Sequence, residues 1–214
     1  MKNFTEAVVV YLGLIVVVFF FYSNLETTII NTEHAVAATS SAVTVSATVV
    51  ATISCSTSQG STAFGTLTDV TVGTASPNTS TTTSCVNSAS GCSLFVKDVG
   101  GGGNPGLYNT TSTSLIESPN ASFSATSTLI AGTEGYGVQA TSTSVGTGAA
   151  FSIANRYLQT GNTVGGLSTT NLTLASSNAT SSNREVIVTY KAAVAAATAA
   201  GSYSDTTTYE CTAN

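Results

Sequence analysis

The most regular pattern in the chain is the alternation of apolar and polar residues from Ala42 to Cys55. Valine, alanine, isoleucine and cysteine occupy one phase of this stretch and threonine or serine the other, and only Val50 is out of phase. A period of two residues is typical of an extended strand that buries one face. We therefore expect a half-buried strand here, which Cys55 ties to another strand.

Similar short segments recur along the rest of the chain, separated by Gly, Ser, Asn and Pro. No amphipathic helical pattern follows residue 40, and the glycine-rich stretch Gly100–Gly106 is expected to be a loop. Short strands at regular spacing indicate an all-β sandwich or barrel. The expected strands are Phe64–Val72, Thr81–Val86, Cys92–Val96 (a hairpin with the strand before it), Leu115–Ile116, Phe123–Leu129, Tyr136–Ala140, Phe151–Ala154, Arg156–Leu158, Asn171–Leu174, Arg184–Val194 and Tyr203–Cys211.

The N-terminal segment has the features of an export signal. Lys2 precedes an apolar run from Ala7 to Tyr22, and the small residues Ala35–Ala37 are suited to cleavage before Ala38. The sequence predicts a signal peptide over residues 1–37, with a retained membrane anchor as the alternative. It then predicts one β-sandwich domain over residues 38–214, in which residues 38–55 form a first strand or a donor strand.

Composition narrows the class of protein. Charged residues are 7% of the chain and Lys and Arg number only five, too few to neutralise a phosphate track, so we expect no nucleic-acid partner. An even number of cysteines in an exported chain is typical of a disulfide framework. We expect two disulfides among Cys55, Cys85, Cys92 and Cys211, a secreted or cell-surface location, and membrane contact only through the N-terminal leader.

Reactive groups are scarce. The only histidine, His34, lies in the predicted leader, so Ser–His and Cys–His nucleophile arrangements are not available to the mature domain. The acidic residues are scattered, and an enzyme would need two of them in one cleft. We expect no enzymatic activity, no catalytic, cofactor-binding or metal-binding residues, and no cofactor. Asp205, on the inward phase of the last expected strand, is expected to bond to backbone near the strand end.

Three pieces of the chain together resemble a known pattern. They are Val43–Cys55 followed by Phe64–Leu67, then Cys85 with a glycine turn and an alternating strand after it, and finally Ala199–Ala213. Their order and spacing resemble spore coat protein U domains and, more distantly, fimbrial subunits of the chaperone–usher type. The resemblance covers the two ends of the domain and leaves about Gly100–Ser182 unmatched.

The resemblance implies an immunoglobulin-like antiparallel β-sandwich with disulfides Cys55–Cys85 and Cys92–Cys211. The rival scheme joins Cys55 to Cys211 and Cys85 to Cys92. Four cysteines allow three connectivities, and the sequence alone does not choose among them.

The resemblance also implies a structural role, as a subunit of a surface filament, coat or extracellular matrix that assembles with itself or other surface subunits through β-strand addition. Val43, Val45, Ala47 and Val49 would be the side chains that dock. The alternative is a monomeric cell-surface module for adhesion or ligand binding, with the unmatched middle as its binding face.

The site at which the leader is cleaved determines which segment could act as a donor strand. Cleavage before Ala38 makes Ala42–Cys55 most simply the domain's own first strand, and this intramolecular arrangement is the favoured expectation. Donation would require its N-terminal half to leave the parent domain while Cys55 stays anchored. Earlier cleavage would instead make Asn24–Ser41 the arm.

Overall fold

The structure, a computed structural model, describes residues 40–214, so the predicted signal peptide over residues 1–37 lies outside the described residues. The chain divides into two units, residues 1–46 and residues 47–214. Of the first unit, residues 40–46 are exposed and belong to no strand. The second unit contains all the strands of the described range.

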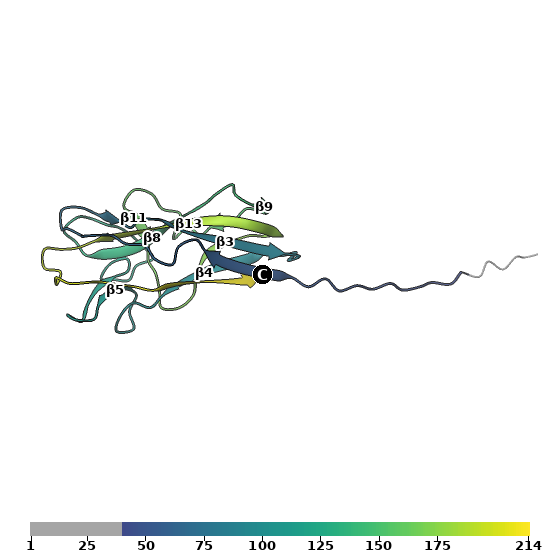
Figure 1. Ribbon diagram of the computed structural model, residues 1–214, viewed down its shortest axis with the longest axis horizontal. Helices are drawn as coiled ribbons and strands as arrows, with labels where there is room; N and C mark the ends of the chain where they lie inside the picture. The colour runs from purple at the N-terminus through teal and green to yellow at the C-terminus, as the bar shows by residue number, and fades with distance from the viewer. Residues whose placement is uncertain (1–39) are drawn as a thin grey trace, which may run out of the picture. The chain divides into compact units, whose positions relative to one another are not determined.

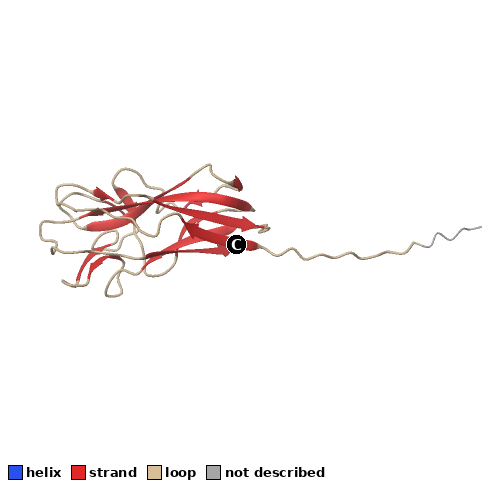
Figure 2. Cartoon of the chain, in the orientation of Figure 1, coloured by secondary structure: helices blue, strands red, loops and turns tan. Residues whose placement is uncertain are grey.

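The described part of the chain consists of strands and loops, with no helix (Figure 2). None of its segments is therefore a helix long and apolar enough to cross a membrane. The strands are β1 (Thr52–Thr57), β2 (Gly73–Thr74), β3 (Thr79–Val86), β4 (Cys92–Asp98), β5 (Gly106–Asn109), β6 (Ser114–Glu117), β7 (Thr126–Thr128), β8 (Gly135–Ser142), β9 (Thr147–Gly148), β10 (Ser152–Ile153), β11 (Thr163–Gly165), β12 (Leu172–Ser176), β13 (Ser181–Ala193) and β14 (Thr207–Ala213).

Two antiparallel sheets form the two layers of a β-sandwich, which confirms the predicted all-β class (Figure 1). The larger sheet has the order β1-β3-β13-β8-β11-β7, and β2 and β9 also pair with β13. The smaller sheet has the order β10-β12-β4-β14, and β5 and β6 form a separate two-stranded ribbon. The strands β1 and β14 are therefore edges of different sheets.

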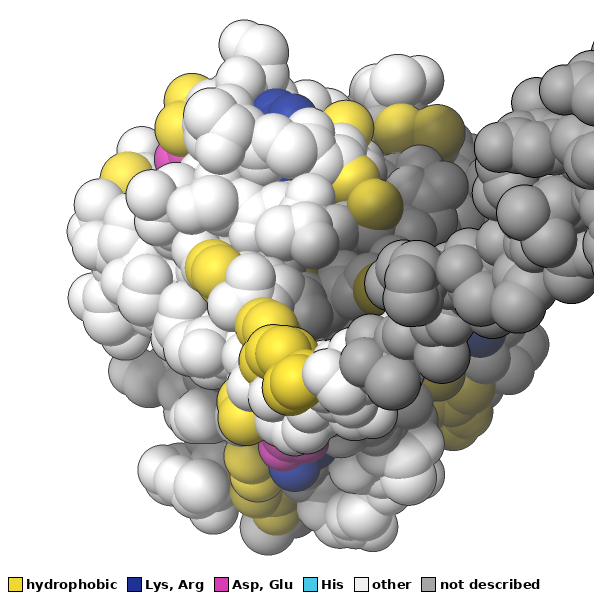
Figure 3. Space-filling model, turned by 90° about the vertical axis from the view of Figure 1, so that its right-hand side faces the viewer, with side chains coloured by type: hydrophobic (Ala, Val, Ile, Leu, Met, Phe, Trp, Pro, Cys, Tyr) yellow, Lys and Arg dark blue, Asp and Glu magenta, His cyan; other side chains and the backbone are white. Residues whose placement is uncertain are grey.

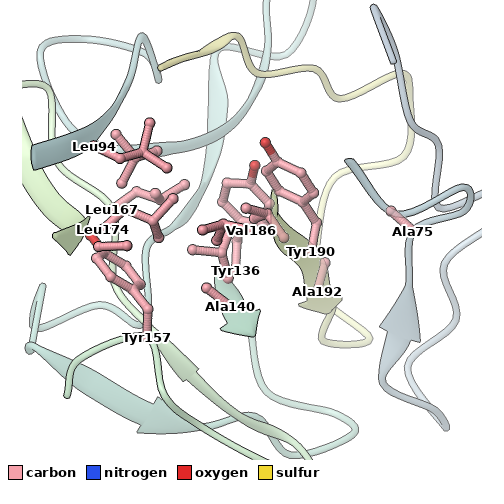
Figure 4. Packing of buried hydrophobic residues seen from close by; sticks show 14 of the residues in the cluster. Ala75, Leu94, Tyr136, Ala140, Tyr157, Leu167, Leu174, Val186, Tyr190 and Ala192 are labelled. Carbon is pink, nitrogen blue, oxygen red and sulfur yellow. The ribbon is translucent and has the colours of Figure 1, made fainter. Parts of the chain in front are cut away.

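The core lies between the two layers and follows from strand alternation (Figure 4). On β4, Leu94 and Val96 point inward with no exposed surface, and Val186 and Val188 do the same from β13. Burial of such side chains stabilises the fold by about 1.5–3 kcal/mol each. The inward phase of β3 is unusual because Thr81 and Thr83 are fully buried there. The Thr81 hydroxyl donates to the Val186 carbonyl at 3.2 Å, which satisfies it inside the sandwich.

The strongest alternating segments were predicted well, at β3, β4, β8 and β13, whereas two expected strands are wrong. Phe64–Val72 forms no strand; Gly65 has a φ of 68°, which bends the chain, and only the isolated bridge Ala63–Ser76 precedes it. Arg156–Leu158 is a turn in which the Tyr157 amide donates to the Ala154 carbonyl. The Tyr157 ring is fully buried in the core. The apolar residue that suggested a strand here is therefore a core residue in a turn.

The predicted hairpin around Asn87–Gly91 is also wrong. Here β3 and β4 do not pair with each other, because β3 belongs to the larger sheet and β4 to the smaller one. The turn carries the chain from one layer to the other, with Asn87 at a φ of 60° and Gly91 at 75°. Cys85 and Cys92 thus face each other across the core.

The disulfides follow the rival scheme, so the favoured pairs Cys55–Cys85 and Cys92–Cys211 are wrong. Cys55 bonds to Cys211 with a Cα–Cα distance of 6.1 Å. Cys85 bonds to Cys92 with a Cα–Cα distance of 6.0 Å. The reason is register: the residue opposite Cys55 is Thr83, so Cys85 is a diagonal neighbour, farther away than a disulfide spans. Both disulfides therefore join the larger sheet to the smaller one.

Candidate functional site

The alternating segment divides at Thr52, and its N-terminal part is not a strand. Residues 40–51 have no strand assignment and are exposed, and Val43, Val45 and Val49 keep 83%, 89% and 71% of their surface exposed. We call residues 42–51 the arm. The expectation that Ala42–Cys55 is one half-buried strand of its own domain is therefore wrong for the arm.

The register of β1 explains where the strand begins. Thr52 pairs with Val86, the last residue of β3, and the next residue, Asn87, turns the chain toward β4. No partner backbone therefore continues beside Ala51 and the residues before it. The arm keeps its strand-forming sequence but has no strand to pair with, while Cys55 stays anchored.

A cavity lies between the segment that follows β1 and the segment that precedes β14. The Cys55–Cys211 disulfide holds β1 and β14 together. The segment after β1 and the segment before β14 form the two walls of the cavity, which has a volume of about 980 Å³. One wall is Thr62–Asp69 and the other is Val194–Asp205. We call this cavity the side groove.

The floor of the side groove is part of the hydrophobic core. It is formed by Leu107, Tyr136 and Tyr190, each at most 6% exposed. The Tyr136 and Tyr190 rings stack with centroids 6.3 Å apart, and Phe64 from the first wall packs edge-on against Tyr136 at 6.2 Å. Figure 4 shows the two tyrosines side by side. An apolar occupant would thus contact core side chains directly.

The walls leave main-chain groups without main-chain partners. Among the described residues, Phe64–Asp69 form no backbone–backbone hydrogen bond, and neither do Ala200–Tyr203 on the opposite wall. Unpaired N–H and C=O groups along two facing segments are what an added extended segment can satisfy. Both walls therefore offer main-chain donors and acceptors to a molecule in the side groove.

Two acidic side chains belong to this region, Asp205 in the second wall and Asp98 behind it. Asp205, in the second wall, accepts hydrogen bonds from the amides of Gly100 at 3.1 Å and Thr206 at 2.7 Å, and from the Tyr136 hydroxyl at 3.1 Å. The expected backbone bonding of Asp205 is thus confirmed. Burial raises the pKa of the Asp205 carboxyl above its ordinary value.

Asp98 lies beneath the wall on the inward phase of β4 and is 3% exposed. Its Oδ2 accepts from the Gly106 amide at 2.9 Å, and its buried Oδ1 has no partner among the described residues. Burial, and next the charge of Asp205, raise the pKa of Asp98 to about 7. Among the described residues the salt bridge is Lys97–Glu210. Neither Asp98 nor Asp205 is therefore paired with a basic side chain there.

The carboxylates do not form the pair that hydrolysis would require. Asp98 does not line the side groove, and both oxygens of Asp205 already accept hydrogen bonds. The other acid in the groove lining, Asp69, comes from the opposite wall. Within residues 40–214, no group of three or more His, Cys, Asp or Glu residues is placed to hold a metal ion. We base no catalytic proposal on these residues.

The sequence pattern identified the arm but missed the groove. Phe64, Tyr136 and Tyr190 are far apart in the chain, and only the fold brings them to one cavity. For Asp98 a signal existed: the inward phase of Cys92, Leu94 and Val96 continues to position 98.

The surface outside the groove is poor in charge. The face in Figure 3 shows mainly uncharged polar side chains and backbone, with few Lys, Arg, Asp or Glu side chains among the atoms not drawn in grey. Comparison of the chain with family models, with curated proteins and with solved structures finds no match.

Proposed function

We propose that the protein is a non-enzymatic structural subunit that assembles with copies of itself at the cell surface or in an extracellular layer. The arm of one copy adds as a strand to the side groove of the next. The observation that carries this proposal is the arm itself: an alternating segment with strand-forming residues, exposed and unpaired. We further infer an immunoglobulin-like arrangement of the sandwich, which its two antiparallel layers support.

The chemistry of the arm matches that of the groove. As a strand, the arm would direct Val43, Val45, Ala47 and Val49 to one face and Thr44, Ser46 and Thr48 to the other. The apolar face would cover Leu107, Tyr136 and Tyr190, and the arm backbone would pair with the unpaired walls. Ten residues span about 33 Å in a strand, so the arm is long enough to present all four docking side chains on one face.

Connectivity favours a second copy as the source of the strand. The arm enters β1 at Thr52, whereas the groove wall begins beyond the other end of β1, after Thr57. To fill its own groove, the arm would have to reverse and run back along β1. The disulfide Cys55–Cys211 holds β1 in place at the start of that path.

The setting of the assembly is also proposed. Two disulfides agree with an oxidising compartment, as expected for an exported protein. A hydroxyl-rich surface with few charged residues suits a layer in which copies lie close together without strong repulsion.

The test compares two pairs of substitutions in the purified protein. Val45→Asp with Val49→Asp places charge on the docking face, and Thr44→Asp with Thr48→Asp places the same charge on the opposite face. We expect the first pair to abolish oligomers in light scattering and electron microscopy, and the second pair to retain them. Equal behaviour of the two pairs, or a wild-type protein that stays monomeric at high concentration, would contradict strand addition. A monomer that binds one glycan specifically would favour the adhesion module.

A further inference from the structure

The Asp98–Asp205 pair lies where groove occupancy would change its surroundings. Asp205 lines the groove and is half-buried, while Asp98 lies behind it, 3% exposed with an unpartnered Oδ1. Strand addition would cover Asp205 with uncharged side chains, because the arm has no charged residue. The pair has no counter-ion, so losing water would make its negative charge less favourable.

The groups around the pair offer no charge that would compensate. Tyr136 from β8 donates to Asp205 and Tyr190 from β13 lies near it, while Tyr157, in the turn before β11, lies near Asp98. Burial raises the pKa of each tyrosine above its ordinary value, so all three stay neutral at physiological pH. Of the basic side chains in this region, Arg156 donates to the Gly166 carbonyl and acts to lower the pKa of Tyr157. Lys97, the neighbour of Asp98 in the chain, pairs with Glu210.

We propose that filling the side groove is coupled to proton uptake by the Asp98–Asp205 pair, so that acid favours assembly. This inference rests on the proposed strand addition and adds its regulation. Docking would remove water from Asp205, which lines the groove, and would thereby weaken the screening of its charge from Asp98 behind it. The pKa of the pair is therefore higher in the filled state than in the empty one. Protons are therefore taken up on docking, which is tighter below the pKa and weaker above it.

The pH range of this effect follows from the pKa of Asp98 when the groove is empty. That pKa is already about 7, so a further rise on docking places the change across and above neutral pH. A rise of one pKa unit for a single carboxyl changes the dissociation constant by about tenfold. Acidification would thus promote assembly and mildly alkaline conditions would loosen it.

A binding experiment tests the coupling. The receptor is the purified protein carrying Val45→Asp and Val49→Asp, so that its own arm does not compete, and the probe is a fluorescent peptide with the sequence of residues 42–51. We expect the dissociation constant to be about tenfold lower at pH 5.5 than at pH 8.5. The further change Asp98→Asn should flatten this dependence, because the amide keeps the shape without titrating. Glu185→Gln, which removes a carboxyl on β13 outside the groove lining, should leave it intact.

Calorimetry on the receptor with its native Asp98 provides a measurement that does not depend on the folding of the asparagine variant. Titrations in two buffers of different ionisation enthalpy should show net proton uptake when the peptide binds. Tight binding without pH dependence or proton uptake overturns the coupling and leaves strand addition standing. Failure of the peptide to bind at any pH overturns strand addition and the coupling together. A folded Asp98→Asn variant that keeps the full pH dependence also overturns the assignment.

Discussion

Thr52 lies opposite Val86 as the first residue pair of the β1–β3 ladder, and no partner strand extends beyond it. The arm begins at this boundary. The sequence before Thr52 continues the same alternation, yet it has no hydrogen-bonding partner within its own domain. A segment suited to a strand but left unpaired is the basis of the proposed assembly.

Removal of the arm should barely affect the stability of the domain. Deletion of residues 38–50 should change the free energy of unfolding by no more than about 0.5 kcal/mol, because the described residues of that segment are exposed. Urea unfolding of the deleted and intact proteins, both held as monomers, provides the measurement. A deletion that unfolds the domain would show that the segment is its own structural strand.

Loss of the two disulfides should have unequal effects. The separations are 156 residues for Cys55–Cys211 and 7 for Cys85–Cys92. The chain-entropy relation gives about 5 kcal/mol for the longer loop and about 2.5 kcal/mol for the shorter one. Paired Cys→Ala variants compared by urea unfolding should keep this order. The reverse order would show that folded-state effects outweigh loop entropy.

Stability should fall as the pH rises toward neutrality. The pKa of Asp98 is raised to about 7 in the fold, above its ordinary value of 3.8, so the folded state holds a proton that the unfolded state releases. The contribution is therefore most favourable below pH 3.8 and is lost as the pH rises to about 7, by roughly 2–4 kcal/mol. Asp98→Asn should remove this part of the dependence, measured as unfolding free energy from pH 4 to pH 8. Equal slopes for both proteins would contradict the raised pKa.

A bulky side chain in the groove should block assembly from the acceptor side. Ala200 is exposed and lines the second wall, so Ala200→Trp would occupy space that the arm needs. We expect monomers by light scattering and an unchanged melting temperature. Ala121→Trp, at an exposed position outside the groove lining, is the matched control and should still assemble. Normal assembly of the Ala200→Trp variant would place the acceptor elsewhere.

The sequence predicted the layers of this fold better than its connections. Alternation identified β4 and β13 because a strand that buries one face has apolar residues at every second position. It did not reveal that β3 and β4 belong to different sheets, since a turn inside one sheet and a crossing between sheets use the same residues. The wrong disulfide pairs came instead from the resemblance to spore coat and fimbrial subunits, whose pairing this chain does not follow.

Of the candidate site, only the arm could be predicted from the sequence. Val43, Val45, Ala47 and Val49 occupy every second position of one short segment, so their shared face follows from their spacing. The groove depends on segments more than a hundred residues apart, and on backbone groups that lack partners, a property that residue types do not encode.

Mixed-label photo-cross-linking tests the central claim most directly. The purified protein would carry a photoreactive residue at Ala47 and be mixed in equal amounts from isotopically heavy and light preparations before irradiation. The account predicts heavy–light cross-links from position 47 to the walls Thr62–Asp69 or Val194–Asp205 of another copy. Cross-links confined to single copies, or directed to other surfaces, would contradict it.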